Sequence, residues 1–78
     1  MKSYTYRIII EPDGKAYHGY APALHGCHTY GASIEETKKN IRDAITLYVQ
    51  HLCDKGADVP EENSFEGFET VMLSKAYA

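Results

Sequence analysis

Apolar and polar residues alternate along the first third of the chain, and this two-residue period predicts β-strands. A first strand is expected over Tyr4–Glu11, where aromatic and β-branched residues dominate. Pro12-Asp13-Gly14 then supplies turn chemistry, because proline fixes φ and glycine tolerates positive φ. A second strand is expected over residues 15–21 and a third over residues 27–30, ending at Pro22 and Gly31 respectively.

The period then changes to that of a helix. Ser33 with Glu36 three residues later has the pattern of a capping box, and Glu35 adds negative charge at the helix N-terminus. The apolar residues that follow form one helical stripe: Ile34, Ile41, Ala44, Ile45, Tyr48, Val49, Leu52 and Cys53. Lys55-Gly56 predicts the end of this helix, which is therefore about 22 residues long.

The remaining residues predict an acidic loop over 58–67 and a fourth strand over Phe68–Lys75. The expected order is β-β-β-α-β, an α+β fold in a single domain over residues 1–78. Short turns join the first three strands into an antiparallel meander, and a right-handed crossover through the helix returns the last strand parallel to the first. These rules give the sheet order 3-2-1-4, with one long helix on one face.

A single helix covers only one face of such a sheet, yet the first and fourth strands carry apolar residues on both faces. Ile9, Val71 and Leu73 lie opposite Ile8, Ile10 and Met72 in the alternation. An exposed apolar face predicts a binding surface or a subunit interface. Because 78 residues gain little net stability from burial, we expect a homo-oligomer, a dimer or a tetramer.

Charge and composition narrow the possible partners. Eight Lys+Arg against eleven Asp+Glu give a net charge of −3, which is not typical of a nucleic-acid-binding domain. The longest apolar block, Ile8–Ile10, is too short for a membrane helix, and the strand-like N-terminus does not have the pattern of a signal peptide. Cys27 and Cys53 are expected to be reduced and packed as small hydrophobes. We therefore expect a cytoplasmic protein without direct contact to membranes or nucleic acid.

A specific combination of turn residues and helix-start residues runs through the chain from about Tyr4 to Pro60. Its members are Glu11-Pro12-Asp13-Gly14, Tyr17, Gly19-Tyr20-Ala21-Pro22, Leu24, Gly26-Cys27, Thr29, Gly31, Ser33-Ile34-Glu35-Glu36-Thr37, Gly56 and Val59-Pro60. Together these residues resemble the HicB antitoxin family, with Thr37 standing where that family usually has alanine. Most of them are turn glycines, a strand-ending proline or cap residues, so the motif mainly specifies the fold.

The resemblance implies a partial RNase H-like fold of β-β-β-α-β order. It also implies a function, because HicB-like domains bind and neutralise HicA toxins, small basic ribonucleases that cleave mRNA with a histidine. Many members of the family carry a C-terminal DNA-binding module that represses the operon. Only Ala76-Tyr77-Ala78 follow Lys75 here, so DNA binding is not expected.

An RNase H relationship raises the alternative of a metal-dependent nuclease, which needs clustered carboxylates to hold two metal ions. The candidates are Glu11, Asp13, Glu35, Glu36 and Glu69. Ile8–Ile10 occupies the middle of the first strand, where such a carboxylate would be expected, and capping explains Glu35 and Glu36. The sequence therefore predicts no enzyme and no catalytic residue.

His25, Cys27 and His28 are three possible metal ligands within four residues. A closed structural zinc site usually takes four ligands from two separated pairs. His51 and Cys53, two residues apart on a helix, point in different directions and do not supply a second pair. We expect no metal and no cofactor.

The favoured function is a HicB-like antitoxin domain that neutralises a HicA-type toxin by protein–protein contact. Glu11, Asp13, Tyr17 and Tyr30 are the predicted partner-binding residues, because they lie near strand ends and turns that a partner can reach. The alternative from another class is an orphan oligomeric scaffold or small-ligand-binding module without a toxin partner.

Overall fold

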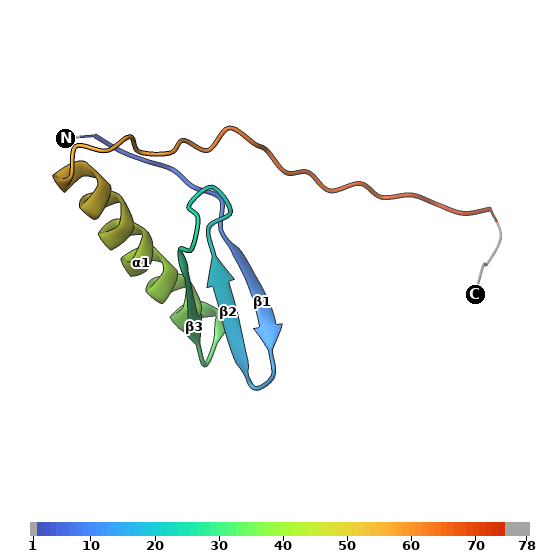
Figure 1. Ribbon diagram of the computed structural model, residues 1–78. Coiled ribbons are helices and arrows are strands. Elements are labelled where there is room, and N and C mark those ends of the chain that lie inside the picture. Colours follow the sequence, from blue (N-terminus) through green and yellow to red (C-terminus); the bar gives the residue numbers. More distant parts are fainter. Residues whose placement is uncertain (1, 75–78) are drawn as a thin grey trace.

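The computed structural model describes residues 2–74, in which a three-stranded antiparallel sheet packs against one long helix (Figure 1). Strands β1 (Ile9–Asp13), β2 (Ala16–Tyr20) and β3 (His28–Gly31) lie in the order β1-β2-β3. Helix α1 (Ile34–Asp54) covers one face of this sheet. The predicted α+β class, the antiparallel meander and the single long helix are therefore confirmed.

The first hairpin turns later than the sequence suggested, because β1 ends at Asp13 instead of Glu11. Asp13 pairs with Ala16, so the turn is Gly14-Lys15, with Gly14 at a φ of +63°. Pro12, expected in the turn, instead lies inside β1 opposite Tyr17. Pairs in an antiparallel ladder alternate, and the pair that flanks a two-residue turn is hydrogen-bonded. Pro12 therefore falls in a non-hydrogen-bonded pair, where its missing N–H faces the open edge of the sheet.

Strand β1 also begins later than predicted, at Ile9 instead of Tyr4. Ile9 pairs with Tyr20, the last residue of β2, and the chain then turns away at Ala21-Pro22. Residues 4–8 consequently have no neighbouring strand among the described residues, although their composition is that of a strand. Tyr6 and Ile8 still pack against the core beside α1.

The helix begins and ends as its sequence predicts. Ser33 is the N-cap, and its hydroxyl accepts a hydrogen bond of 3.1 Å from the Glu36 N–H. The Glu36 carboxylate reaches back to the backbone N–H of Ala32 at 2.9 Å. At the other end, Gly56 has a φ of +68° and donates to the Cys53 carbonyl, while Ala57 donates to the Leu52 carbonyl. This pair of bonds is the Schellman motif, which satisfies two carbonyls of the last turn.

The core is small and lies between the helix and the β2–β3 connection. Its buried residues are Ala21, Leu24, Cys27, Thr37, Ile41 and Val49. Three backbone hydrogen bonds tie the connection together, from Ala21 to Cys27, from Leu24 to Ala21 and from Cys27 to Leu24. They hold the Leu24 side chain against the helix, where it is 1% exposed. Cys27 is buried as predicted, whereas Cys53 is exposed; both are free thiols.

The predicted fourth strand does not form within the described residues. Residues 57–74 form no strand, and the predicted order 3-2-1-4 is replaced by a sheet of three strands. Lys75, the expected last residue of that strand, lies outside the described residues. Figure 1 shows the segment extending away from the sheet, in orange to red. A strand forms only where another strand offers its backbone groups. The hydrogen bonds and ion pair of this segment with the N-terminal residues are at Tyr6 and Arg7, before β1 begins.

Candidate functional site

One face of the sheet is covered by α1, and the other is open. We call the second one the open face. It consists of Ile9, Glu11, Asp13, Ala16, His18, Tyr20, His28 and Tyr30. Side chains alternate between the faces of a strand, and residues directly opposite each other in a ladder share a face. The helix-covered face is marked by Gly19 and Gly31, both in close contact with Thr37 of α1.

The strand register arranges six residues of the open face as two rows across the three strands. Glu11 lies opposite His18, which lies opposite Tyr30. In the neighbouring row, Ile9 lies opposite Tyr20, and Tyr20 lies opposite His28. Each row thus takes one residue from each strand.

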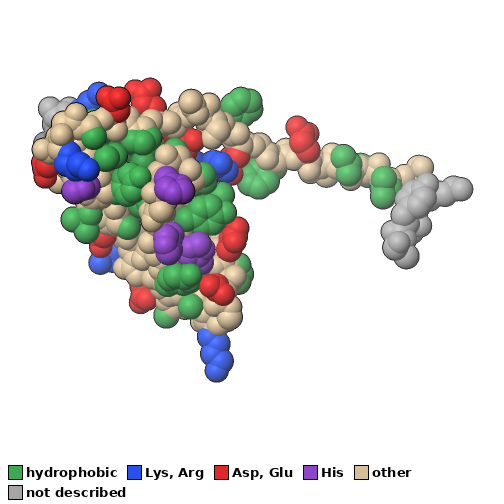
Figure 2. All heavy atoms as spheres, viewed as in Figure 1, with side chains coloured by type: hydrophobic (Ala, Val, Ile, Leu, Met, Phe, Trp, Pro, Cys, Tyr) green, Lys and Arg blue, Asp and Glu red, His purple; other side chains and the backbone are tan. Residues whose placement is uncertain are grey.

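The aromatic rings of these rows form one cluster around His18. The His18 ring lies 4.8 Å from the Tyr30 ring and is stacked with the Tyr20 ring at 5.3 Å between centroids. Across the strands, His18 Nε2 lies 3.3 Å from His28 Nδ1, within hydrogen-bonding distance. Figure 2 shows histidine side chains, in purple, beside hydrophobic side chains, in green. The cluster combines ring area with polar tips, a combination that is enriched at protein interfaces.

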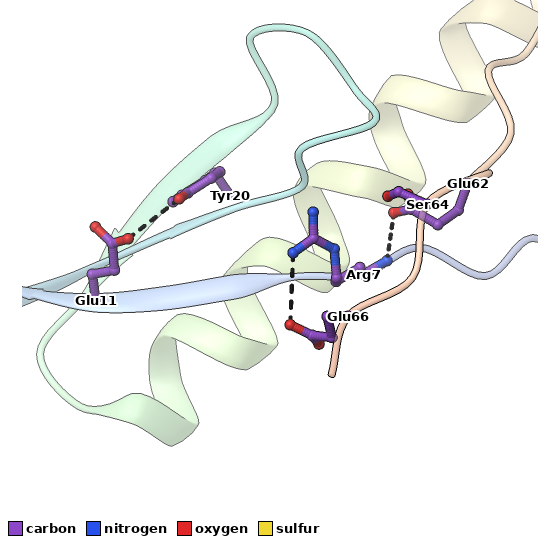
Figure 3. A network of polar contacts seen from close by, with 6 residues as sticks. All are labelled: Arg7, Glu11, Tyr20, Glu62, Ser64 and Glu66. Atoms are coloured by element: carbon purple, nitrogen blue, oxygen red, sulfur yellow. Dashed lines mark hydrogen bonds and ion pairs between the residues drawn. The ribbon is translucent and has the colours of Figure 1, made fainter. Parts of the chain in front are cut away.

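Glu11 adds negative charge at the edge of the cluster. The Tyr20 hydroxyl donates to Glu11 Oε1 at 3.2 Å (Figure 3). Loss of solvent around the phenol, together with the neighbouring Glu11 carboxylate, raises the pKa of Tyr20 above its ordinary value of 10.0. The protonated Tyr20 hydroxyl is the donor in this contact.

A shallow hollow of about 370 Å³ borders the open face where β2 ends and β3 begins. Its lining combines His18, Tyr20 and His28 with the β2–β3 connection, including His25. Gly26 has a φ of +78° in this connection, a backbone conformation that glycine adopts readily.

The structure separates the four predicted partner-binding residues into two groups. Glu11 and Tyr30 belong to the same row of the open face, and Asp13 lies two residues further along β1 on that face. Tyr17 lies opposite Pro12 and Gly31 and points to the helix-covered face, where it is half-buried. The histidine pair of the cluster was not among the predicted contacts.

The character of the open face also differs from the sequence-based expectation of an apolar surface. Ile9 and Ala16 are its aliphatic residues, and the remaining six are aromatic, imidazole or carboxylate side chains. The apolar residues expected beside Ile9 were Val71 and Leu73, which do not join this sheet. The sequence does contain a signal for the His/Tyr cluster. β2 and β3 each carry a histidine followed two residues later by a tyrosine, His18/Tyr20 and His28/Tyr30, and this spacing puts both residues of a pair on one face of a strand.

The candidate nuclease carboxylates do not gather in the described part of the chain. Glu36 is bound to the Ala32 N–H and Glu11 to the Tyr20 hydroxyl, on different elements. Within residues 2–74, no group of three or more His, Cys, Asp or Glu side chains is placed to hold a metal ion. Among the same residues, no helix is long and apolar enough to cross a membrane.

Comparison with known proteins gives a consistent result. The sequence matches the HicB-like antitoxin of bacterial toxin-antitoxin systems over residues 6–77. It is 40% identical over 62 residues to a UPF0150 protein of Synechocystis, covering 77% of each chain. A UPF0150 protein of Helicobacter pylori is 40% identical over 57 residues, covering 72% of this chain and 79% of that one.

A solved structure agrees with the fold described above. The crystal structure of the N-terminal domain of Burkholderia pseudomallei antitoxin HicB has a TM-score of 0.65 and 34% sequence identity to this chain. The similarity covers 74% of this chain and 69% of that one. Fold and sequence thus place the protein in the class of antitoxin domains from bacterial toxin-antitoxin systems. The chain belongs to the HicB-like antitoxin family, which confirms the resemblance found in the sequence.

Proposed function

We propose that this domain neutralises a HicA-type, mRNA-cleaving toxin by binding it through the open face of the sheet. The observation that carries the proposal is the row Glu11–His18–Tyr30, which lies on the sheet face that α1 does not cover. Tyrosine rings supply much of the binding energy in protein interfaces. Inhibition would then be steric, since the bound antitoxin covers the ribonuclease surface without doing chemistry itself.

Charge supports a basic partner for this face. The charged side chains that β1 places on the open face, Glu11 and Asp13, are both acidic. The chain as a whole carries a net charge of −3. Complementary charge speeds association and selects a basic toxin over acidic proteins. The same charges disfavour phosphate contacts, so we propose no direct binding to nucleic acid.

Three of the four sequence-predicted residues fit this binding mode. Glu11, Asp13 and Tyr30 are accessible together on the open face. Tyr17 would be reached only by a partner on the helix side of the sheet. We propose the cytoplasm as the site of action, because the mRNA that such a toxin cleaves is found there.

The test is co-expression with the product of the adjacent gene, where that gene encodes a small basic protein. We expect a complex that survives purification and restores growth of cells that express the toxin. Glu11→Lys places like charge against the basic partner, so the affinity should fall about tenfold or more by calorimetry. Tyr30→Ala removes a ring that is 50% exposed and should weaken binding by a similar factor.

Leu47→Ala provides a matched control on the helix. Its side chain is 71% exposed and lies on α1, away from the open face. This variant should bind as the wild type does. Equal weakening by Leu47→Ala and Tyr30→Ala would exclude the open face as the binding surface, and no complex with the basic neighbour would refute toxin binding.

We also propose that the domain forms homo-oligomers. The sheet ends at β1 without a neighbouring strand in the described residues, although its sequence encodes a further strand-like segment. Completion of the predicted order 3-2-1-4 would remove this edge.

A further inference from the structure

Strand β1 presents an open edge whose backbone groups can accept another strand. Within the described residues β1 pairs with β2 alone. Ile10 lies in a non-hydrogen-bonded pair with Gly19, by the alternation that starts at Asp13 and Ala16. Its N–H and C=O therefore point away from β2. An unpaired edge of this kind is a template for pairing with another chain.

An apolar groove lies next to the residues that lead into β1. It lies between residues 4–8 and helix α1 and has a volume of about 330 Å³; we call it the edge groove. Ile8 contributes to one wall, and Ile41 and Ile45 contribute to the other. Lys38 and Arg42 of the helix also line it, so the groove combines apolar walls with positive charge.

The chain carries a segment that matches this groove. Phe68–Leu73 has strand composition, and its apolar side chains are almost fully in solvent, with Phe68 at 95% and Met72 at 92% exposure. Its six residues would span about 20 Å as a strand, the same length as Ile8–Asp13. Glu69 in the segment complements the positive charge of the edge groove. The family match runs through this segment to residue 77, so it is part of the domain.

Three contacts fix the path of the chain before this segment. The Tyr6 hydroxyl donates to the Pro60 carbonyl at 2.6 Å, and the Arg7 N–H donates to Glu62 Oε1 at 3.0 Å. Arg7 Nη1 then pairs with Glu66 Oε2 at 3.6 Å (Figure 3). Because Glu62 and Glu66 both contact Arg7, the chain crosses residues 4–8 here instead of running along β1.

This crossing carries the segment away from its own edge groove. Tyr6 and Ile8 face the core and α1, so Arg7, which lies between them in this extended stretch, points to the other side. Glu66 meets Arg7 on that side, and the segment leaves from there. To enter the groove of its own chain, it would have to release these contacts and double back.

We infer that Phe68–Leu73 of one copy pairs with the β1 edge of a second copy and packs into its edge groove. The exchange is reciprocal, so one dimer buries two exposed segments and two open edges. Each sheet then gains its fourth strand next to β1, in the order 3-2-1-4 expected from the sequence. The inference specifies the self-association proposed above and does not depend on toxin binding, so it is tested on the antitoxin alone.

The test combines light scattering with amide hydrogen exchange on the full chain. The wild type should have the mass of a dimer, and the Ile10 amide, which faces away from β2, should be protected from exchange. The double variant Phe68→Asp/Met72→Asp should be a monomer in which Ile10 exchanges at least tenfold faster. Phe65→Asp is the matched control, because Phe65 is 97% exposed and precedes the pairing segment. It should remain a dimer with Ile10 protected.

The outcomes separate this inference from its alternatives. A wild-type monomer with a protected Ile10 amide would mean that the segment closes on its own chain, which refutes exchange. A dimer in which Ile10 exchanges freely would leave self-association standing and refute the role of the β1 edge. A monomer in which the Ile10 amide exchanges freely would refute both self-association and the pairing of a strand with the β1 edge. None of these measurements involves a toxin, so toxin binding is judged separately.

Discussion

Thr37 packs against Gly31 so closely that a Cβ atom on Gly31 would lie 2.6 Å from the Thr37 backbone nitrogen. The same threonine meets Gly19 on the neighbouring strand, where a Cβ would lie 2.8 Å from Thr37 Cγ2. Thr37 is fully buried, and its hydroxyl donates to the Ser33 carbonyl at 2.7 Å. The two glycines therefore set the distance between the first turn of α1 and the sheet.

This geometry predicts different outcomes for two alanine substitutions. Gly19→Ala should lower the free energy of unfolding by about 1–3 kcal/mol, because the added methyl overlaps a side-chain methyl. Thr37→Ser removes that methyl and keeps the hydroxyl, so it should recover most of the loss in the double variant. Gly31→Ala should cost at least as much and should not be rescued, because its methyl overlaps the Thr37 backbone. Urea unfolding of the single and double variants measures both couplings.

Equal rescue of both glycine variants by Thr37→Ser would show that the helix can shift away from the sheet at this position. The close contact of Thr37 with the two glycines would then not determine the position of α1 on the sheet.

The helix N-terminus gives a second stability prediction. Ser33→Ala removes the acceptor for the Glu36 N–H and should cost about 1 kcal/mol of unfolding free energy. Ser3→Ala, at an exposed position in the N-terminal segment, should change stability little. Thermal or urea unfolding measures the difference. A cost at Ser33 no larger than at Ser3 would mean that the cap contributes nothing.

The sequence predicted the helix well because its limits depend on local groups. Ser33, Glu36 and Gly56 act within one turn of their own positions, and the structure shows each in its expected contact. The start of β1 depends instead on where β2 ends. That limit is set by the Ala21–Cys27 connection, which the first strand's own residues do not encode.

Non-local geometry likewise explains why the rows of the open face could not be predicted from the sequence. The turn at Gly14-Lys15 fixes the register, and the register decides that Glu11 and Tyr30 share a row with His18. A turn one residue earlier would have changed that pairing. The composition of Phe68–Lys75 predicted a fourth strand, but residues 68–74 form none, because composition does not specify whether another strand lies alongside to pair with.

The two cysteines should differ in their reactivity toward alkylating reagents. Burial raises the pKa of the Cys27 thiol above its ordinary value of 9.0, and its side chain is 5% exposed. Cys53 is exposed near the end of α1. Iodoacetamide at pH 8 should therefore modify Cys53 first and leave Cys27 largely intact, as measured by mass spectrometry of the tryptic peptides.

Unfolding in urea before alkylation supplies the control, since both cysteines should then react at similar rates. Equal modification of both cysteines in the folded protein would mean that the Ala21–Cys27 connection opens readily.

Glu62 predicts how acid affects the path of the chain after the helix. Hydrogen bonds from the Ser64 hydroxyl and from the Arg7 N–H hold the pKa of the Glu62 carboxyl below its ordinary value of 4.5. A lowered pKa in the folded state means that the contact is fully formed above pH 4.5 and is lost as the pH falls through the lowered pKa. The Arg7 amide resonance should therefore shift in acid with a midpoint below 4.5.

In Glu62→Gln this transition should be absent, while Glu61→Gln, which removes the neighbouring carboxylate, should leave it in place. A midpoint at or above 4.5 in the wild type would show that the Arg7–Glu62 contact does not hold the chain at this crossing.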